Sequence, residues 1–331
     1  ITKKFPLVLA NDNVSFEVAW GEVHALIGEN GAGKSTLMKI LYGMQPPDEG
    51  KILIDGKEVK FASAKDAIKL GIGMVHQHFM LVEPLTVTEN LVLGSEPVAG
   101  IGLDYKSARK KTADLIKRFG FDLDPDTQIE DLAVGFQQQV EILKTLYRDA
   151  RILIMDEPTA VLTPQETRGL FKFVRDFAAG GNAVVFISHK LDEVMEICDR
   201  MSVMRDGKMI GTVKQAETNQ RQLANMMVGR EVLLRVDKKP PTPKEVRLEV
   251  KQITIKHPSK PKAILENVSF GVRGGEILGI AGVEGNGQKE LVECIAGLMK
   301  PDTGRIIIEG KDMSEWTARA RRGEGLSHIP E

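Results

Sequence analysis

The sequence is poor in cysteine, in net charge and in long apolar runs, and each shortage argues against a class of protein. Two cysteines, Cys198 and Cys294, lie far apart among 331 residues, which suggests a reducing compartment and core positions rather than a disulfide or metal pair. A formal net charge of −1 argues against a dedicated nucleic-acid surface, so we expect no nucleic-acid partner. No apolar run approaches the ~18–20 residues of a spanning helix and no signal peptide is recognisable, so we expect any membrane role to come through a partner chain.

A glycine-rich loop dominates what is present. GENGAGKST at residues 28–36 matches the pattern G-x-x-x-x-G-K-[ST] at every fixed position. An apolar stretch at 22–27 (EVHALI) predicts a buried strand before the loop, and apolar residues at helical spacing predict a helix after it. The backbone N–H groups of such a loop surround phosphate oxygens. We therefore expect nucleotide binding by Gly28, Glu29, Asn30, Gly31, Ala32, Gly33, Lys34, Ser35 and Thr36.

Two side chains of this loop and one upstream aromatic have specific expected roles. Lys34 would reach the β- and γ-phosphates of a nucleoside triphosphate, and the Ser35 hydroxyl would ligate Mg²⁺. Phe5 lies where an aromatic ring could stack on the nucleotide base, although a lone phenylalanine is as readily a core residue. Further along, KILIDG at 51–56 predicts another short strand.

Two further segments predict strands that end in polar residues. The apolar run at 151–155 ends in Asp156 and Glu157, and AVVFI at 183–187 is followed by Ser188 and His189. Continuous apolar character is typical of parallel strands buried on both faces, and their carboxyl ends form the ligand edge of an open α/β sheet. The alternating segment 13–18 (NVSFEV) instead predicts a half-solvated antiparallel strand.

The segment 71–79 (GIGMVHQHF) predicts a strand, and residues 85–147 predict helices. His76 and His78 raise the alternative of a metal site, but no cysteine or carboxylate stands at ligand spacing from them. In the helical region, one face carries Ala108, Thr112, Leu115, Ile116 and Phe119, with basic residues around the rest. We interpret those basic residues as a solvated face rather than as a site for an acidic partner.

After a charged, proline-rich linker the sequence starts again. A shift of 254 positions maps 13–16 (NVSF) onto 267–270, and it also superposes the glycines and the Pro-Asp turn of the two segments. This register indicates a duplication. The expected domains are residues 1–232, a linker at 233–246, and the first part of a second copy at 247–331. Because the chain begins with Ile1 and stops at Glu331, the counterpart of Gln77, we expect a fragment whose second copy is truncated.

The second glycine loop has diverged at the positions that matter for phosphate and metal. Gln288 stands at the position of Lys34, and Lys289 stands at that of Ser35. The glycines survive, but the phosphate lysine and the magnesium hydroxyl do not. We expect weak or altered nucleotide binding by this loop.

Taken together, these motifs resemble those of the ATP-binding subunits of ABC transporters. The sequence around the motifs is similar to that of the tandem-domain importer ATPases for nucleosides and simple sugars. The resemblance covers the whole sequence. It rests on the phosphate loop, Gln77 as the Q-loop, residues 132–136 (LAVGF) at the signature position, Asp156-Glu157 as the end of the Walker B strand, and Ser188-His189 as the H-loop. It implies an α/β fold, a P-loop NTPase with a mixed β core, an antiparallel β subdomain and a helical subdomain.

The resemblance also implies roles for these residues. Asp156 would hold Mg²⁺ together with Ser35 and Gln77, Glu157 would orient or deprotonate the attacking water, and His189 would contact the γ-phosphate. The signature departs from the LSGGQ-like pattern, because Ala133 lacks the hydroxyl that would contact nucleotide on the opposite domain. In ABC dimers each signature completes the partner's site, so LAVGF would face the eroded loop at Gln288. We therefore expect one hydrolytic and one degenerate site, and poor turnover by this fragment alone.

The expected function is energy coupling by ATP and Mg²⁺ at the cytoplasmic face of the cell membrane. By the resemblance, the partners are integral membrane permease subunits, an extracytoplasmic solute-binding protein and the second nucleotide-binding domain of the same chain. One alternative is a soluble tandem ABC ATPase acting on ribosomes or DNA, although such proteins usually carry a long charged arm and two intact loops. Another alternative is a nucleotide-binding scaffold without turnover. The sequence does not identify the transported solute.

Overall fold

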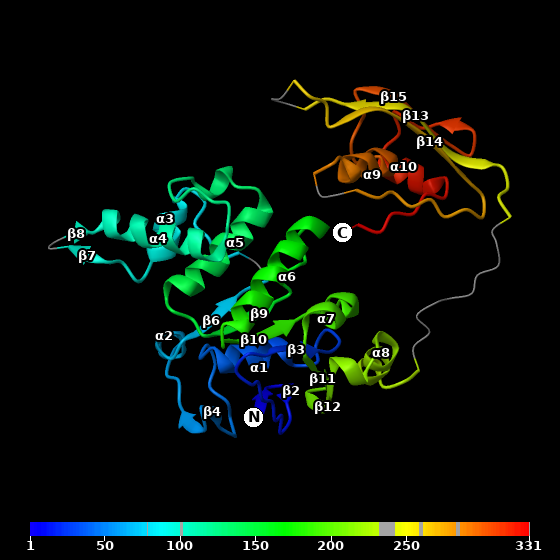
Figure 1. Ribbon diagram of the computed structural model, residues 1–331. Helices are drawn as coiled ribbons and strands as arrows, with labels where there is room; N and C mark the ends of the chain where they lie inside the picture. Colours follow the sequence, from blue (N-terminus) through cyan, green and yellow to red (C-terminus); the bar gives the residue numbers. More distant parts are fainter. Residues whose placement is uncertain (78, 100–101, 232–241, 258–260, 283–284, 331) are drawn as a thin grey trace. The chain divides into compact units, whose positions relative to one another are not determined.

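The structure is a computed structural model that describes residues 1–77, 79–99, 102–231, 242–257, 261–282 and 285–330. The chain divides into two compact units, Ile1–Leu234 and Arg235–Glu331 (Figure 1). Most of the predicted linker, residues 233–241, lies outside the described residues, as do His78 and Glu331. Each unit is described by itself below.

A six-stranded mixed sheet forms the centre of the first unit, in the order β12-β11-β3-β10-β9-β6. Its strands are β3 (Val23–Ile27), β6 (Ile72–Val75), β9 (Ile152–Asp156), β10 (Ala183–Ile187), β11 (Arg200–Arg205) and β12 (Lys208–Lys214). All neighbouring pairs are parallel except β11 and β12. Every residue of β3 and β10 is buried, so the prediction of parallel strands buried on both faces is confirmed.

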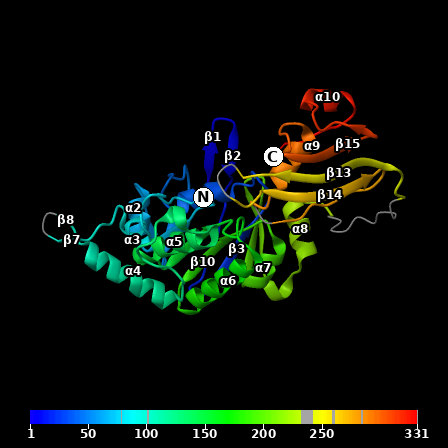
Figure 2. The same cartoon turned by 90° about the horizontal axis from the view of Figure 1, so that it is seen from above.

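Helices cover both faces of this sheet (Figures 1 and 2). The helices α1 (Lys34–Leu41) and α2 (Ala64–Lys69) pack on one face, where Leu37, Met38 and Ala67 join a core cluster with the strands. The helices α6 (Pro164–Ala179), α7 (Leu191–Ile197) and α8 (Gln220–Val228) pack on the other face. Cys198 is a free, buried thiol of that second core, and burial raises its pKa.

The predicted helical region forms a part of its own beside the sheet (Figure 2). It comprises α3 (Val87–Val92), α4 (Tyr105–Phe119) and α5 (Val134–Tyr147), with the short strands β7 (Val98–Ala99) and β8 (Gly102–Leu103) and the 3₁₀ turn Ile129–Asp131. The predicted apolar stripe of α4 is confirmed, because Ala108, Thr112, Leu115 and Ile116 are buried and Phe119 packs against their cluster. On the polar side, Arg109 and Asp126 form a bidentate ion pair.

Two antiparallel hairpins complete the first unit, together with a second 3₁₀ turn at Gln215–Glu217. They are β1 (Lys3–Phe5) with β2 (Val8–Asn11), and β4 (Ile52–Ile54) with β5 (Lys57–Val59). The first hairpin stands away from the central sheet in Figure 2. Phe5 is 41% exposed there, so the alternative of a core position for this ring is wrong.

The predicted strand at residues 13–18 is wrong, although its burial pattern is right. Val14 is buried, Phe16 and Val18 are half-buried and the residues between them are exposed, but the segment is not a strand. Val14 exchanges its backbone hydrogen bonds with Ile1 alone. The counterpart of this segment in the second unit lies in β14 (Leu265–Arg273), which pairs along its length with β13 (Val246–Ile255). Alternation therefore indicated a two-sided environment, whereas a strand also needs a neighbouring backbone.

Among its described residues, the second unit contains a four-stranded antiparallel sheet in the order β14-β13-β15-β16 and two helices. The elements besides β14 are β13 (Val246–Ile255), β15 (Thr303–Ile308), β16 (Lys311–Asp312), α9 (Gln288–Ala296) and α10 (Ala318–Gly323). The helices α9 and α10 begin 254 positions after α1 and α2. Turn geometry repeats as well, with φ of 84° at Gly31 and 83° at Gly285.

One segment of the second unit differs from its counterpart. Residues 277–281 correspond to the buried strand β3, yet they form no strand and Ile277 is 85% exposed. In the first unit β3 lies between β10 and β11. The described residues of the second unit contain no strands equivalent to these two neighbours, so the apolar segment has nothing to pair with.

Candidate functional site

The site lies at the carboxyl edge of the central sheet of the first unit. Three neighbouring parallel strands, β3, β10 and β9, end at this edge. Directly after them come the phosphate loop, the pair Ser188-His189 and Glu157. The predicted concentration of polar residues at one edge is therefore what this topology produces.

The phosphate loop is a tight backbone turn that begins after β3 and leads directly into α1. Gly33 has φ of 96° and is the N-terminal cap of α1. A Cβ atom at this position would lie 2.1 Å from the backbone oxygen of Ala10, so only glycine fits here. Gly28 and Ala32 are buried, while Glu29, Asn30, Gly31 and Ser35 are exposed on the outer side of the loop and Thr36 is half-buried.

Lys34 points back into its own loop. Its ammonium group donates hydrogen bonds to the carbonyl oxygens of Gly28 at 2.7 Å and Glu29 at 3.0 Å. The residue is only 8% exposed, and burial lowers the pKa of Lys34, an effect that the negative charges of Glu157 and Asp156 partly offset. The loop thus holds one desolvated cation next to two carboxylates.

Asp156 and Ser35 are brought together as the sequence predicts for a pair of metal ligands. The Ser35 hydroxyl is close enough to the Asp156 carboxylate to lower the pKa of that group. Burial and the charge of Glu157 raise the pKa of Asp156, while Lys34 and His76 act in the opposite direction. Hard oxygen donors in a locally negative environment fit a divalent cation such as Mg²⁺. Among the described residues there is no cluster of three or more His, Cys, Asp or Glu side chains that would hold a metal by itself.

Glu157 and His189 are in direct contact. Oε1 of Glu157 lies 2.8 Å from Nδ1 of His189. The backbone of Glu157 is left-handed, with φ of 49°, and its N–H donates to the carbonyl oxygen of Ile187, which fixes the carboxylate at the end of the sheet. Its other oxygen, Oε2, is buried and has no hydrogen-bond partner in the described part of the chain. A buried oxygen acceptor without a donor lowers the stability of the folded protein, so its presence here points to a functional role for Oε2.

Gln77 and Phe5 are not brought into this cluster. Gln77 is exposed, two residues past the end of β6, and it makes no hydrogen bond to Ser35 or Asp156 within the described residues. Phe5 lies on the projecting β1–β2 hairpin, with the ammonium group of Lys3 5.8 Å from its ring centroid. Both assignments therefore stay predictions.

The segment at the signature position begins α5, with Ala133 as the N-terminal cap. No side-chain hydrogen bond caps this helix, because alanine has no hydroxyl. Gly135 lies directly against the side chain of Glu166 on α6, since a Cβ atom at Gly135 would come 1.9 Å from its Oε1. The signature segment is therefore in contact with the helix that follows Glu157 in the chain.

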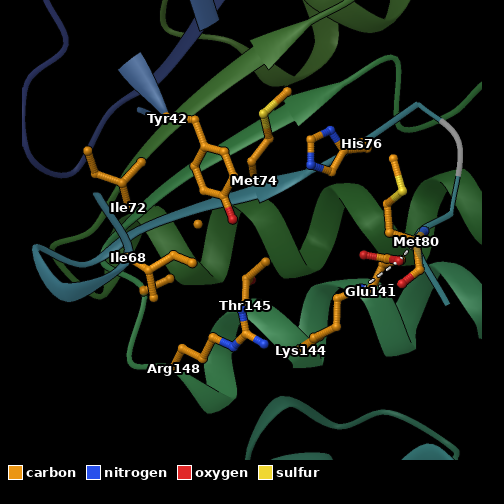
Figure 3. Close-up of a pocket in the computed structure, with 12 residues that line it drawn as sticks. Tyr42, Ile68, Ile72, Met74, His76, Met80, Glu141, Lys144, Thr145 and Arg148 are labelled. Atoms are coloured by element: carbon orange, nitrogen blue, oxygen red, sulfur yellow. Dashed lines mark hydrogen bonds and ion pairs between the residues drawn. The ribbon is translucent and has the colours of Figure 1, made fainter. Parts of the chain in front are cut away.

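A cavity of about 140 Å³ lies between β6 and α5 rather than at the phosphate loop. Figure 3 shows Tyr42 and His76 on one side of it, and Glu141 and Thr145 of α5 with Arg148, the C-terminal cap of that helix, on the other. The Glu141 carboxylate accepts the backbone N–H of Met80 at 2.5 Å. This bond ties the segment that contains Gln77 to the helix that begins at the signature position.

The second glycine loop has a similar backbone conformation where its helix begins, but different side chains follow. Its helix α9 is capped by Gly287, with φ of 90°. The side chain of Gln288 fills the space beside Gly282, where a Cβ atom would lie 1.9 Å from its amide nitrogen. Lys289 is exposed, and Val283 and Glu284 lie outside the described residues.

Two residues that support the site were not predicted from the sequence. Asn11 is fully buried and donates from its side chain to the carbonyl oxygen of Gly33 at 3.1 Å. Glu166 supports the signature segment, as described above. Asn11 has no local signal, because it reaches the loop from β2, whereas the pattern T-x-x-E at 163–166 signals only a helix cap.

Comparisons with known proteins agree with this geometry. The family model for ABC transporters matches residues 11–160 and 265–331. The chain is 48% identical to the nucleoside import ATP-binding protein NupA of Lactococcus lactis and 47% identical to the guanosine import ATP-binding protein NupO of Bacillus subtilis. It is also 45% identical to the xylose import ATP-binding protein XylG of Thermoanaerobacter pseudethanolicus. Each match includes the whole chain but only 65–66% of the relative.

Solved structures give the same fold. The ADP conformation of MJ1267, described as an ATP-binding cassette of an ABC transporter, matches with a TM-score of 0.61 and 26% identity over 70% of this chain and 96% of that one. A nucleotide-free ATP-binding cassette matches with a TM-score of 0.60 and 25% identity over 69% of this chain and 92% of that one. The predicted cassette fold, with its mixed sheet, antiparallel hairpins and helical part, is confirmed.

Proposed function

The chain belongs to the ABC transporter family, and from this premise we propose that it is an ATP-binding and ATP-hydrolysing subunit that powers import of a nucleoside or a simple sugar through a separate membrane permease. The observation that carries the proposal is the meeting of three features at one sheet edge. These are a phosphate loop holding a buried lysine, a hydroxyl–carboxylate pair, and a glutamate with one unpartnered oxygen beside a histidine.

In this proposal Lys34 binds the β- and γ-phosphates. A phosphate oxygen is a stronger acceptor than the carbonyl oxygens of Gly28 and Glu29, because its bond to an ammonium group is charge-assisted on both sides. The ammonium group therefore moves from these two carbonyls to the phosphates when nucleotide enters. The backbone N–H groups of the loop contribute further donors.

Glu157 and His189 position and activate the water molecule that attacks the γ-phosphate. The unpartnered Oε2 of Glu157 is the atom that accepts a hydrogen bond, and then a proton, from this water. The contact with Nδ1 of His189 holds the other carboxylate oxygen and leaves the rest of the imidazole ring, which is largely exposed, to face the γ-phosphate.

Ser35 and Asp156 hold Mg²⁺, which would offset the charge that develops on the phosphates. Gln77 is the third proposed ligand. Because Gln77 lies apart from the other two, it would have to approach them when nucleotide and metal are bound. Phe5 would stack on the base from the β1–β2 hairpin.

Import through a permease is supported by the relatives, whose names describe import ATP-binding proteins for nucleosides and sugars. These names favour import over action on ribosomes or DNA. Within the described residues, no helix has the length and apolar character needed to cross a membrane. We place the chain at the cytoplasmic face of the membrane, where Gln77 and the helices beyond Pro84 contact the permease and a solute-binding protein acts on the other side.

The second unit is, in this proposal, the first part of a second and degenerate nucleotide-binding domain. The repeated positions of α1 and α9 and of their capping glycines support this assignment. Gln288 replaces the phosphate lysine in the second loop, and Ala133 lacks the hydroxyl of the usual signature. Lys34 therefore belongs to the hydrolytic site, and the loop at Gln288 belongs to the degenerate one.

The experiment that tests the proposal is affinity capture of the tagged protein from detergent-solubilised cells. We expect the captured complex to contain multi-spanning membrane proteins and to hydrolyse ATP in the presence of Mg²⁺. The control is an unrelated protein with the same tag. It should be captured equally well, but without the membrane proteins and without the ATP hydrolysis. Recovery of ribosomes or DNA-repair proteins without any membrane protein would overturn the import function. Hydrolysis that does not depend on nucleotide binding by Lys34 would overturn the assigned site.

A further inference from the structure

The loops that carry Glu157 and His189 are joined by a second set of contacts next to their direct one. Thr159, two residues after Glu157, donates from its hydroxyl to the Glu193 carboxylate at 2.5 Å. Glu193 stands four residues after His189, on α7. Lys190, the residue directly after His189, donates to the backbone oxygen of Thr159 at 3.2 Å and to its hydroxyl at 3.3 Å.

These contacts close into a three-residue network in which Thr159 and Glu193 are shielded from water and the Lys190 side chain is 39% exposed. Lys190 and Glu193 form an ion pair at 3.0 Å, Thr159 is 1% exposed, and the Glu193 side chain is 15% exposed. The Thr159 hydroxyl is used both as donor and as acceptor. Because hydrogen bonds to charged groups in such surroundings are strong and directional, the network fixes the two loops relative to each other.

The His189 side chain has little else to hold it. It is 62% exposed, and Lys190, the N-terminal cap of α7, makes no side-chain hydrogen bond that caps the helix. The turn before α7 is held by the Ser188 hydroxyl, which accepts the N–H of Lys190 at 3.0 Å, and by the Lys190 contacts to Thr159. The direction of the imidazole ring therefore depends on where Lys190 and Glu193 are anchored.

We propose that Thr159 and Glu193 are positioning residues, which hold the His189 imidazole against Glu157 in the geometry needed for hydrolysis. The proposal rests on the proposed ATPase function. It deepens that function by adding two residues that touch neither nucleotide nor metal in the proposed mechanism. Removing the Thr159 hydroxyl takes the donor from Oε2 of Glu193 and one of the acceptors from Lys190. The Lys190–Glu193 pair is then no longer tied to the loop of Glu157 by this hydroxyl, so the turn that carries His189 shifts.

The first test measures the position of His189 without any nucleotide. In the ¹⁵N-histidine-labelled chain, the imidazole signals of His189 are assigned by their disappearance in His189→Gln. We expect the Nδ1 signal to move in Thr159→Val and in Glu193→Gln, and to return to its wild-type position in Thr159→Ser, which keeps the hydroxyl. The matched control is Glu217→Gln, which removes an i,i+3 lysine–glutamate pair on the surface and leaves the signal in place.

The second test is ATP hydrolysis by the captured membrane complex. We expect kcat to fall about tenfold to hundredfold in Thr159→Val and Glu193→Gln, the loss that follows a displacement of about 1 Å at a reacting group, with KM for ATP within about twofold of wild type. In a His189→Ala background, Glu193→Gln should cost nothing further. The Thr159→Ser variant should recover at least half of wild-type kcat.

The two tests separate failure of this proposal from failure of the ATPase function. A wild-type complex that does not hydrolyse ATP contradicts the proposed function, and the imidazole signal still decides whether Thr159 and Glu193 hold the ring. An unmoved Nδ1 signal in folded Thr159→Val and Glu193→Gln overturns the positioning role, whatever their activity. A loss of kcat in His189→Ala/Glu193→Gln beyond that of His189→Ala also overturns it. If Thr159→Val does not fold, Glu193→Gln alone decides in both tests.

Discussion

The ammonium group of Lys34 lies 2.7 Å from the carbonyl oxygen of Gly28, in the same loop. The lysine therefore occupies the space that the loop offers to phosphate. This arrangement keeps a buried cation hydrogen-bonded when no anion is present, since an unpartnered buried charge would be costly. When nucleotide binds, its phosphate oxygens therefore replace the carbonyl oxygens of Gly28 and Glu29 as acceptors for Lys34, and no new cavity has to open.

Replacing Lys34 with methionine should weaken ATP binding without unfolding the protein. Charge-assisted hydrogen bonds contribute about 1.5–3 kcal/mol, so we expect the dissociation constant for ATP to rise about tenfold to hundredfold. Isothermal titration of the chain with the nucleotide and Mg²⁺ measures it. The matched control is Lys289→Met in the second loop, which should change the constant less than about twofold. Equal losses in both variants would contradict the assignment of the intact site to Lys34.

Replacing Glu157 with glutamine should abolish turnover and preserve binding. Glutamine keeps the shape of the side chain and one carbonyl oxygen, but it cannot take a proton from water. Removing a general base typically costs 10²–10⁴-fold, so we expect kcat of the captured complex to fall by about that factor while ATP affinity stays within about threefold. Steady-state hydrolysis and titration on the same preparation measure the two quantities.

The control for Glu157→Gln is Glu217→Gln, which changes a surface carboxylate in the 3₁₀ turn Gln215–Glu217 and removes only an exposed ion pair with Lys214. It should leave the turnover intact. A Glu157→Gln complex that retains more than about a tenth of wild-type kcat would show that another group activates the water.

The sequence allowed the phosphate loop and its strand–helix context to be predicted because both are local. A glycine loop after a buried strand has few other uses, and β3 and α1 lie at the expected residues. The carboxyl-edge residues Asp156 and Glu157 followed from the same logic, since an apolar run that ends in acidic residues has its polar end at the ligand edge. These features needed no knowledge of distant contacts.

What the sequence left open depends on residues that are far apart in the chain. Asn11 supports Gly33 from another hairpin, and Glu166 supports Gly135 from another helix. Neither contact can be predicted from the local sequence pattern. The segment 13–18 shows the same limit, because its alternation was read correctly but its missing strand neighbour was not visible. Gln77 is assigned to the metal site only because of its motif. To reach Ser35 and Asp156 it would have to move, and the sequence pattern does not predict such a movement.

Replacing Ala133 with serine should stabilise the first unit. Ala133 has the extended conformation of an N-terminal cap, with φ of −62° and ψ of 153°, so a serine hydroxyl there can accept a free N–H of the first turn of α5. Such caps contribute about 0.5–2 kcal/mol. We expect the free energy of unfolding to rise by that amount. Urea unfolding followed by Trp20 fluorescence, in a Trp316→Phe background so that only the first unit reports, measures it.

The control for this cap is Ala133→Val, which adds volume without an acceptor. Because valine is a poor N-terminal cap, we expect no gain in stability from it. A serine variant no more stable than the valine variant would show that the first-turn N–H groups of α5 are already satisfied.

His24 should make the first unit sensitive to acid. The ring is fully buried between Glu22, at 2.8 Å from Nδ1, and Ser202, at 2.8 Å from Nε2. Burial lowers the pKa of His24, and the charge of Glu22 only partly offsets this. In the unfolded chain the ring takes up its proton near the ordinary pKa of about 6.5. Below that pH the unfolded state therefore binds more protons than the folded state, and the free energy of unfolding falls as the pH falls.

Replacing His24 with glutamine should flatten this dependence between pH 7 and pH 5. Glutamine cannot be protonated in this range, so the variant loses the contribution of one group, at most about 1.4 kcal/mol per pH unit, even if its stability at pH 7 is lower. Urea unfolding at several pH values, again with Trp20 as the probe, gives the two slopes. The His328→Gln variant, in the second unit, should keep the wild-type slope. If His24→Gln keeps it as well, then the acid sensitivity arises from carboxylates, and the buried ring is protonated equally in both states.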